Sequence, residues 1–296
     1  MSNSLACDAA NMTTVPSPRD IFSGLVEFSP AFGPRPEINH VLLDFDGTLS
    51  LIRQGWPEVM SSMFMEVLPR AAGESDADLR RFVYDDIMRL NGKQTIYQMI
   101  QLAERIRERG GSPQEPLWYK HEYLARLDRR ISERIDGLRS GVLRPDDLLV
   151  HGARRMLERL QELGLALHLA SGTDEPCVKT EAELLDVSRY FGPRVHGAQD
   201  DYRSFSKKLV IERILREHAI AGGRLLAFGD GYVEIENTKA VGGLAVGVAS
   251  DEVHNGSGQM DPWKRQRLLG VGADVIIPDF RDIEPLLGCL GLVNNR

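Results

Sequence analysis

An apolar run over residues 41–45 ends in two carboxylates one residue apart, Asp44 and Asp46. A short apolar run bounded by glycine predicts a buried strand, and open α/β sheets place their chemistry at the carboxyl ends of such strands. Two acids on an apolar strand are costly unless they are paired, protonated or bound to a cation. The pair therefore indicates a functional site, with a strand that runs into an Asp–Gly turn as the alternative.

Two later segments carry groups that suit an anion. Ser171 and Gly172 follow an apolar run over residues 165–170, and a hydroxyl with free backbone N–H groups at a strand end suits a phosphate or another oxyanion. Lys207 and Lys208 stand before a helical pattern, where the helix dipole disfavours a positive charge. A lysine that reaches back toward acids and phosphate explains this position, and so does a solvated helix entry.

A third segment repeats the pattern of a strand that ends in acids. Residues 225–228 are apolar, Asp230 follows between two glycines, and Glu234 comes four residues later. Two acids with a glycine hinge suit a hard divalent cation such as Mg²⁺, and a Gly–Asp–Gly turn is the alternative. Because the carboxyl ends of parallel strands lie along one edge, the acids, the hydroxyl and the lysine can converge there.

Strand and helix patterns alternate from His40 onward, which predicts an α/β fold with a parallel sheet and helices on both faces. The expected strands are residues 41–45, 165–170, 225–228, 244–248 and 275–277, and the expected helices are residues 153–163, 176–185, 208–218 and 263–269.

One interval breaks this alternation. Roughly 100 residues separate the first strand from the next, far more than an ordinary crossover loop needs. Helical spacing recurs within the interval, which predicts a helical insertion directly after the acid pair. The expected helices of the insertion are residues 58–69, 77–90, 95–109 and 116–138.

Composition narrows the class of protein. The chain has 296 residues, 42% hydrophobic and 27% charged, as expected of a globular protein. A net charge of −7 without a long basic run argues against nucleic acid as a partner. The three scattered cysteines indicate a reducing compartment, and the absence of a membrane span or a secretory signal favours a cytoplasmic protein. The seven histidines are dispersed and form no ligand pair at helical spacing, so no zinc site is expected.

Taken together, these residues resemble the motifs of the haloacid-dehalogenase-like superfamily over about residues 40 to 290, and the insertion resembles the helical cap of its phosphoglycolate-phosphatase-like branch. The resemblance implies a Rossmann-like core formed by residues 38–55 and 145–296 and a helical cap formed by residues 56–144. Residues 1–37 are rich in Ser, Asn, Thr and Pro, which indicates a loosely held extension. The matching positions are Asp44-Phe45-Asp46-Gly47-Thr48, Ser171, Lys207, and Gly229-Asp230 with Glu234.

The resemblance also implies a mechanism. Asp44 attacks phosphorus and becomes an aspartyl-phosphate, while Asp46 protonates the leaving alcohol and then activates water. Mg²⁺ is the implied cofactor, held by Asp44, the backbone carbonyl of Asp46, and Asp230, with Glu234 orienting the metal shell. The family usually has aspartate where Glu234 stands, and contact with the metal through a water molecule is the alternative to direct contact for the longer glutamate.

Ser171, the Gly172 N–H and Lys207 are the implied phosphate-binding groups. Lys207 is preferred over its rival Lys208, because Lys208 is expected to begin the helix proper. Proline commonly follows the lysine in this family, and Lys208 stands there instead.

The expected function is that of a Mg²⁺-dependent phosphatase acting on a small phosphorylated metabolite, with a sugar or polyol phosphate favoured. A phosphosugar mutase retains both acids and is the alternative. The acids at positions 46, 230 and 234 argue against a dehalogenase, and a non-catalytic binding protein is disfavoured for the same reason. The expected substrate contacts are Arg53, Trp56, Lys93, Gln94 and Thr95; packing at the cap hinge and solvent exposure are the alternatives for Trp56 and Lys93.

Overall fold

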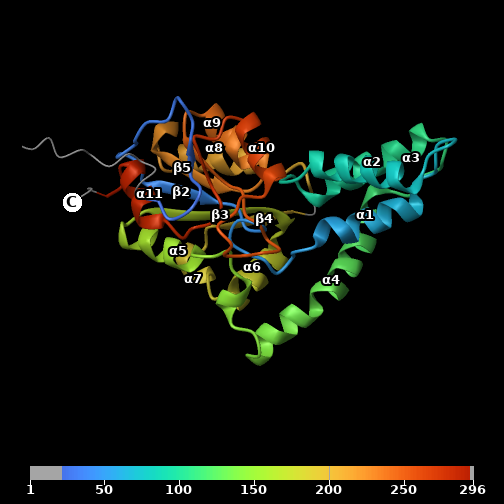
Figure 1. The fold of residues 1–296 in the computed structure, drawn as a ribbon, viewed down its shortest axis with the longest axis horizontal. Coiled ribbons are helices and arrows are strands. Elements are labelled where there is room, and N and C mark those ends of the chain that lie inside the picture. The colour runs from blue at the N-terminus through green and yellow to red at the C-terminus, as the bar shows by residue number, and fades with distance from the viewer. Residues whose placement is uncertain (1–21, 200, 294–296) are drawn as a thin grey trace, which may run out of the picture.

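The computed structural model describes residues 22–199 and 201–293 of the chain. Their centre is a seven-stranded sheet in the order β1-β7-β6-β5-β2-β3-β4, in which β1 is antiparallel to β7 and the other neighbours are parallel (Figure 1). The α/β fold class with a Rossmann-like parallel core is therefore confirmed. The strands are β1 (Glu27–Phe28), β2 (His40–Leu43), β3 (Ala166–Asp174), β4 (Val195–Ala198), β5 (Leu225–Gly229), β6 (Leu244–Val248) and β7 (Val275–Ile277).

Strand β2 lies at the point where the order of the strands along the chain reverses. It is buried along its whole length and pairs with β3 on one side and β5 on the other, so that Leu43 lies opposite both Leu169 and Phe228. The chain continues outward from β2 through β3 to β4, and then crosses back to β5 and runs outward through β6 to β7. Crevices form at such switch points, outside the carboxyl ends of the strands.

Helices cover both faces of the sheet (Figure 1). Side chains alternate across a strand, so in β2 Leu43 joins the larger core, whereas Leu42 packs under the helix that begins at residue 207. Helices α8 (Lys207–Glu217), α9 (Tyr232–Ala240) and α10 (Pro262–Gly270) lie on one face, and α5 (Ala153–Glu162), α6 (Glu175–Leu184) and α7 (Ser188–Phe191) on the other; α11 (Ile283–Leu290) follows β7.

The predicted helical insertion is present between β2 and β3 and lies to one side of the sheet (Figure 1). Its first helix begins at Trp56, earlier than expected, because Pro57 is suited to the first turn, where no backbone N–H is needed. The helices of the insertion are α1 (Trp56–Val67), α2 (Asp76–Arg89), α3 (Thr95–Glu108) and α4 (Pro116–Ser140), followed by the short 3₁₀ helix η2 (Pro145–Leu148).

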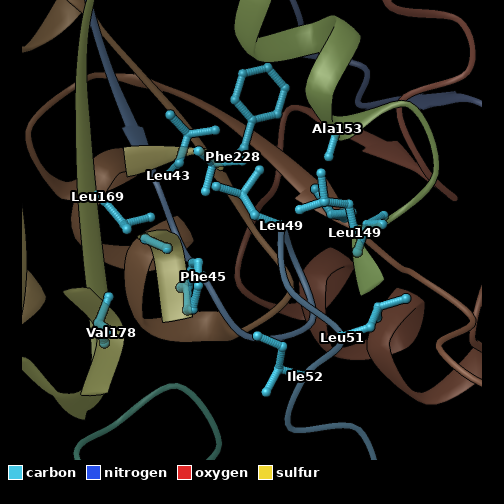
Figure 2. Packing of buried hydrophobic residues seen from close by; sticks show 14 of the residues in the cluster. Leu43, Phe45, Leu49, Leu51, Ile52, Leu149, Ala153, Leu169, Val178 and Phe228 are labelled. Carbon is cyan, nitrogen blue, oxygen red and sulfur yellow. The ribbon is translucent and has the colours of Figure 1, made fainter. Parts of the chain in front are cut away.

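Apolar side chains around the start of the insertion fix the loop that carries the acid pair. Phe45 and Leu49, which flank Asp46, are fully buried and belong to the same cluster as Leu43, Leu149 and Phe228 (Figure 2). The loop after β2 is therefore anchored on both sides of Asp46 by core packing rather than free at the surface.

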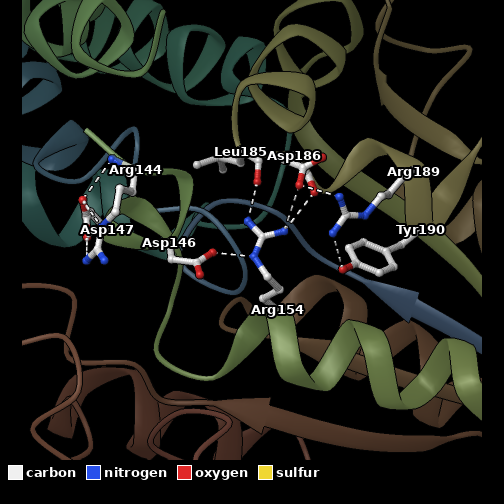
Figure 3. A network of polar contacts seen from close by, with 8 residues as sticks. All are labelled: Arg144, Asp146, Asp147, Arg154, Leu185, Asp186, Arg189 and Tyr190. Carbon is white, nitrogen blue, oxygen red and sulfur yellow. Dashed lines mark hydrogen bonds and ion pairs between the residues drawn. The ribbon is translucent and has the colours of Figure 1, made fainter. Parts of the chain in front are cut away.

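A polar network ties the end of the insertion to the core (Figure 3). The Arg154 guanidinium of α5 pairs with Asp146 of η2 and donates hydrogen bonds to the backbone carbonyls of Leu185 (2.9 Å) and Asp186 (3.0 Å). One side chain thus joins the returning chain to the turn between α6 and α7.

The structure differs from the sequence-based expectation in several elements. Strand β4 and helices α7, α9 and α11 were not expected; β4 reads Val-His-Gly-Ala and carries too little apolar pattern to be recognised. Residues 22–37 are not loosely held, because β1 pairs with β7 and Glu27 forms a two-pronged ion pair with Arg265. The remainder of the expected extension, residues 1–21, lies outside the described residues, as does Cys7.

Within the described part of the chain, no helix is both long and apolar enough to cross a membrane.

Phe228 provides a test of the core packing. It is fully buried in β5, and its ring centroid lies 5.7 Å from that of Phe280. We expect Phe228→Ala to lower the free energy of unfolding by about 3–5 kcal/mol, because it removes apolar contacts and leaves a cavity. Urea unfolding measures this, with the exposed Val142→Ala as a control that changes stability by less than about 0.5 kcal/mol. Equal effects of the two substitutions would contradict the packing described.

Candidate active site

The carboxyl edge of the three central strands brings the expected motifs together around one cavity of about 70 Å³. Asp44 and Asp46 follow β2 directly, Ser171 and Gly172 lie near the end of β3, and Asp230 follows β5. The insertion supplies the opposite wall. The lining residues are Asp44, Asp46, Arg53, Trp56, Asn91, Gly92, Lys93, Thr95, Gln98, Tyr123, Ser171, Gly172, Thr173, Lys207 and Asp230.

Lys207 joins two of the buried acids. Its Nζ lies 2.8 Å from Asp44 Oδ1 and 2.7 Å from Glu234 Oε2, and all three side chains are nearly inaccessible to solvent. Burial raises the pKa of Asp44, Lys207 opposes this effect, and the neighbouring Glu234 and Asp230 carboxylates add to it. The two acids keep the pKa of Lys207 above its ordinary value despite burial, so Lys207 is a permanent cation beside Asp44.

Helix α8 begins at Lys207, one residue earlier than expected, and its first two residues, Lys207 and Lys208, point in different directions. Ser206 is its N-cap and accepts a hydrogen bond from the Leu209 N–H, which makes Lys207 the first helical residue. Lys207 points into the site, whereas the Lys208 side chain is 68% exposed and faces Glu212. The structure thus brings Lys207, and not Lys208, to Asp44.

Asp46 is held by one oxygen only. Its Oδ2 accepts hydrogen bonds from Thr173 Oγ1 (2.8 Å) and Ser171 Oγ (3.2 Å). Its Oδ1 is buried, lacks a hydrogen-bond partner, and lies 3.9 Å from Arg53 Nε. Buried carboxylate oxygens normally have a partner, so Oδ1 is available to a group that enters the cavity.

A change of register in β3 reorients the segment that carries Ser171 and Gly172. The pairing of β3 with β4 shifts between Ala170 and Asp174, so that Ser171, Gly172 and Thr173 leave the regular ladder. Bulges of this kind redirect side chains and free backbone groups beside functional sites. Here the Ser171 hydroxyl turns toward Asp46 and also accepts a hydrogen bond from the Thr173 N–H.

Glycines allow the insertion to approach the core backbone closely. A Cβ on Gly172 would lie 2.6 Å from the carbonyl oxygen of Lys93, and a Cβ on Gly231 would lie 3.2 Å from Cα of Gly92. The first distance excludes any side chain at position 172 without movement of the insertion. The loop between α2 and α3 therefore rests directly on the backbone at Gly172 and at Gly231.

A second buried lysine of the site, Lys264, lies beside Asp230. Lys264 Nζ of α10 lies 2.9 Å from Asp230 Oδ2 and 2.7 Å from Glu252 Oε1. The Asp230 N–H donates to Thr48 Oγ1, which fixes the loop after β5 against the loop after β2. Neither Lys264 nor Glu252 belongs to a recognised motif. The signal that points to Glu252 is its place just after β6, at the same edge of the sheet.

The acids fit a divalent cation in position and in charge. Asp44, Asp230 and Glu234 each offer an oxygen within 4.8 Å of the others. With Glu252 they make four carboxylates facing two ammonium groups, those of Lys207 and Lys264. Buried charges of one sign need compensation, and two uncompensated negative charges match one Mg²⁺, which prefers such oxygen ligands.

Glu234 is already engaged by the protein. Its Oε1 accepts the Gly231 N–H (2.9 Å), and its Oε2 faces Lys207. Asp46, which was also expected near the metal, points its carboxylate to Thr173 and lies outside the cluster of metal-binding carboxylates. Asp44 and Asp230 are thus the side chains best placed to bind a cation directly.

The expected substrate contacts divide into two groups. Arg53, Trp56, Lys93 and Thr95 line the cavity, although Arg53 is also paired with Glu181 (2.6 Å). Gln94 does not line the cavity. Its amide instead donates to the backbone carbonyls of Tyr202 (2.9 Å) and Phe205 (2.8 Å), so that it fastens the insertion to the core.

Three further polar residues of the insertion reach the cavity without a signal in the sequence. Asn91, Gln98 and Tyr123 lie at ordinary helical or loop positions, and only the packing of α2, α3 and α4 brings them there. Burial raises the pKa of the Tyr123 hydroxyl, so this group is a neutral hydrogen-bond donor over the physiological range.

The chain belongs to the haloacid dehalogenase-like hydrolase family, whose model matches residues 38–242. The match includes Asp44, Asp46, Ser171, Gly172, Lys207, Asp230 and Glu234, and it also spans the helical insertion. Comparison with curated proteins finds no match.

Solved structures share the fold at low identity. A conserved haloacid dehalogenase-like protein of unknown function from Agrobacterium tumefaciens is 18% identical, with 85% of this chain and 98% of that chain covered and a TM-score of 0.56. A predicted phosphoglycolate phosphatase from Haemophilus somnus is 16% identical, with 84% and 98% covered and a TM-score of 0.53. A putative beta-phosphoglucomutase from Thermotoga maritima is 19% identical, with 84% and 98% covered and a TM-score of 0.51.

Removal of the second ammonium group tests the charge balance. We expect Lys264→Met to lower the free energy of unfolding by about 3–5 kcal/mol, because it leaves Asp230 and Glu252 buried without their cation. Added Mg²⁺ should then raise the melting temperature more in this variant than in the unmodified protein. Thermal melts with and without Mg²⁺ measure both effects. The exposed Lys208→Met is the control, and an equal Mg²⁺ response in all three proteins would contradict the charge balance.

Gln94 offers a test of the attachment between insertion and core. Gln94→Ala removes two hydrogen bonds, so we expect faster hydrogen exchange in residues 91–95 and 202–206. Mass-spectrometric exchange measures this, with Gln114→Ala, an exposed position in the loop before α4, as the control. Unchanged protection in both segments would show that Gln94 does not fasten them.

Proposed function

We propose that this chain is a Mg²⁺-dependent phosphatase that hydrolyses a small phosphorylated metabolite through an aspartyl-phosphate. The observation that carries the proposal is the unequal treatment of the two acids: Asp44 is bound to a fixed cation, Lys207, whereas Asp46 keeps one oxygen free in the same cavity. A neighbouring cation favours the charged form that a nucleophile needs, and a proton shuttle needs an oxygen that the protein does not already bind. Each acid therefore has the surroundings that its role requires.

In the first half-reaction, a carboxylate oxygen of Asp44 attacks phosphorus, and the bond between phosphorus and the leaving oxygen breaks. The leaving oxygen takes a proton from Asp46. In the second half-reaction, water attacks phosphorus and gives its proton to the Asp46 carboxylate. The bond between phosphorus and Asp44 breaks, which releases inorganic phosphate and restores both acids.

Fixed positive charge and hydrogen-bond donors would hold the transferring group. Lys207 already lies at Asp44, and the Ser171 hydroxyl and Gly172 N–H lie in the stretch of β3 freed by the register shift. Groups that are fixed before the reaction stabilise developing charge without reorganisation. Mg²⁺, held by Asp44, Asp230 and the backbone carbonyl of Asp46, would neutralise further negative charge on the phosphoryl oxygens.

We assign the cap to residues 56–144 and the catalytic core to residues 38–55 and 145–296. The cavity of about 70 Å³ holds a phosphoryl group and little else, since one water already needs about 10–15 Å³. A larger leaving group would extend into the neighbouring cavity of about 430 Å³, which shares Trp56, Asn91 and Asp230 with it. Polar side chains of the insertion that line the smaller cavity, among them Thr95 and Asn91, suit a sugar or polyol phosphate.

The proposal predicts loss of phosphate release in two variants. With Mg²⁺ and a panel of sugar and polyol phosphates, Asp44→Asn should reduce release of inorganic phosphate to background, because an amide is a poor nucleophile. Asp46→Asn should lower kcat by about 10²–10⁴-fold, because the proton shuttle is lost. The control is Asp136→Asn, whose side chain is 74% exposed on α4.

Two outcomes would overturn the proposal. Phosphate release by Asp44→Asn at the rate of the unmodified protein would remove Asp44 as the nucleophile. Conversion of a sugar phosphate into an isomer without release of phosphate would assign a mutase instead.

A further inference from the structure

Four of the seven histidines, dispersed in the sequence, gather on one face of the sheet. His40 begins β2, His168 lies in β3, His196 lies in β4, and His218 follows α8 directly. Leu42 pairs with His168, and Ala170 pairs with His196. Since residues two apart share a face, His40, His168 and His196 form a diagonal row on the side covered by α8.

Three of these rings lie at distances that suit a shared metal ion. His40, His168 and His218 each offer a ring nitrogen within 4.8 Å of the other two, and His40 Nδ1 lies 3.2 Å from His168 Nε2. A tetrahedral zinc site has metal–nitrogen bonds of about 2.0–2.1 Å, which places ligand nitrogens about 3.3–3.4 Å apart. One pair already has this spacing, and rotation of the exposed His218 ring brings in the third.

Two members of the group, His40 and His168, are buried, with exposed fractions of 7% and 3%. The His168 nitrogen that faces His40 is Nε2, whereas its Nδ1, the other ring nitrogen, makes no hydrogen bond. Imidazole nitrogen is the commonest protein ligand of zinc-type ions.

We propose that His40, His168 and His218 form a binding site for a divalent transition-metal ion of the zinc type, with a fourth position open to water. His196 is not assigned as a ligand, because it lies outside the group of ring nitrogens within 4.8 Å of one another, and its Nδ1 faces Arg213 at 2.9 Å. Imidazole nitrogens select zinc-like ions over Mg²⁺, whereas the carboxylates at Asp44 and Asp230 select Mg²⁺. Exposed His218 supplies the entry path.

This site lies at the opposite end of β2 from the acid pair. His40 and Asp44 are four residues apart, which corresponds to about 13 Å along a strand. Helix α8 begins with Lys207 and ends just before His218. A bound ion would therefore fix the carboxyl end of the helix whose first residue faces Asp44, without touching the acid pair itself.

His218→Ala tests the proposal, because an exposed residue at a helix end can be replaced without disturbing the core. The matched control is His121→Ala, which removes an exposed histidine from α4. Zinc stoichiometry is measured by equilibrium dialysis in excess Mg²⁺, and Co²⁺ binding is followed by visible absorption. Zinc bound at the carboxylates cancels in the comparison, because all three proteins contain them.

We expect the unmodified protein and His121→Ala to bind one more zinc ion per chain than His218→Ala does. We also expect intense Co²⁺ absorption bands typical of tetrahedral nitrogen coordination, and at least about tenfold weaker Co²⁺ binding in His218→Ala. Melting without metal should be the same for all three proteins. Equal zinc stoichiometry in all three, or Co²⁺ spectra without these bands, would show a hydrogen-bonded histidine cluster and overturn the site.

Discussion

The need to stabilise like charges at the carboxyl edge of the central strands governs the rest of this structure. Asp44, Asp230, Glu234 and Glu252 lie close together in a protein interior, where their mutual repulsion and desolvation are costly. Lys207 and Lys264 reach them from two different helices, α8 and α10. These two helices must therefore dock on the sheet correctly before the acids can be buried, which couples assembly of the core to assembly of the site.

The topology of the sheet explains why a few residues are enough to build the site. Successive strands are added outward on either side of β2, and the loops that follow β2, β3, β5 and β6 all begin at the same edge of the sheet. Short loops then need to supply only one or two polar groups each. The insertion begins at the same edge, directly after the acid pair, so it covers the cavity without a long connection.

Much of this arrangement was predictable, because it depends on local patterns. Apolar runs that end in Asp44, Ser171 and Asp230 mark both the central strands and the motifs, and the four helices of the insertion follow from helical spacing and proline or glycine boundaries. Lys264, Glu252 and the histidine row were not predictable in this way. Their partners lie far away in sequence, and only the strand register and helix docking bring them together.

The glycine contacts between insertion and core have a mechanical consequence. At Gly172 and at the Gly92–Gly231 contact the two backbones approach closely, with the Val233 and Glu234 side chains of the core beside the second contact. Few side chains interlock across such a seam, so little repacking is needed for the two surfaces to part. Closure must then be stabilised by the few directional bonds beside the seam, such as those of Gln94. The energy barrier to opening becomes a property that single substitutions beside the seam can tune, independently of the chemical groups below it.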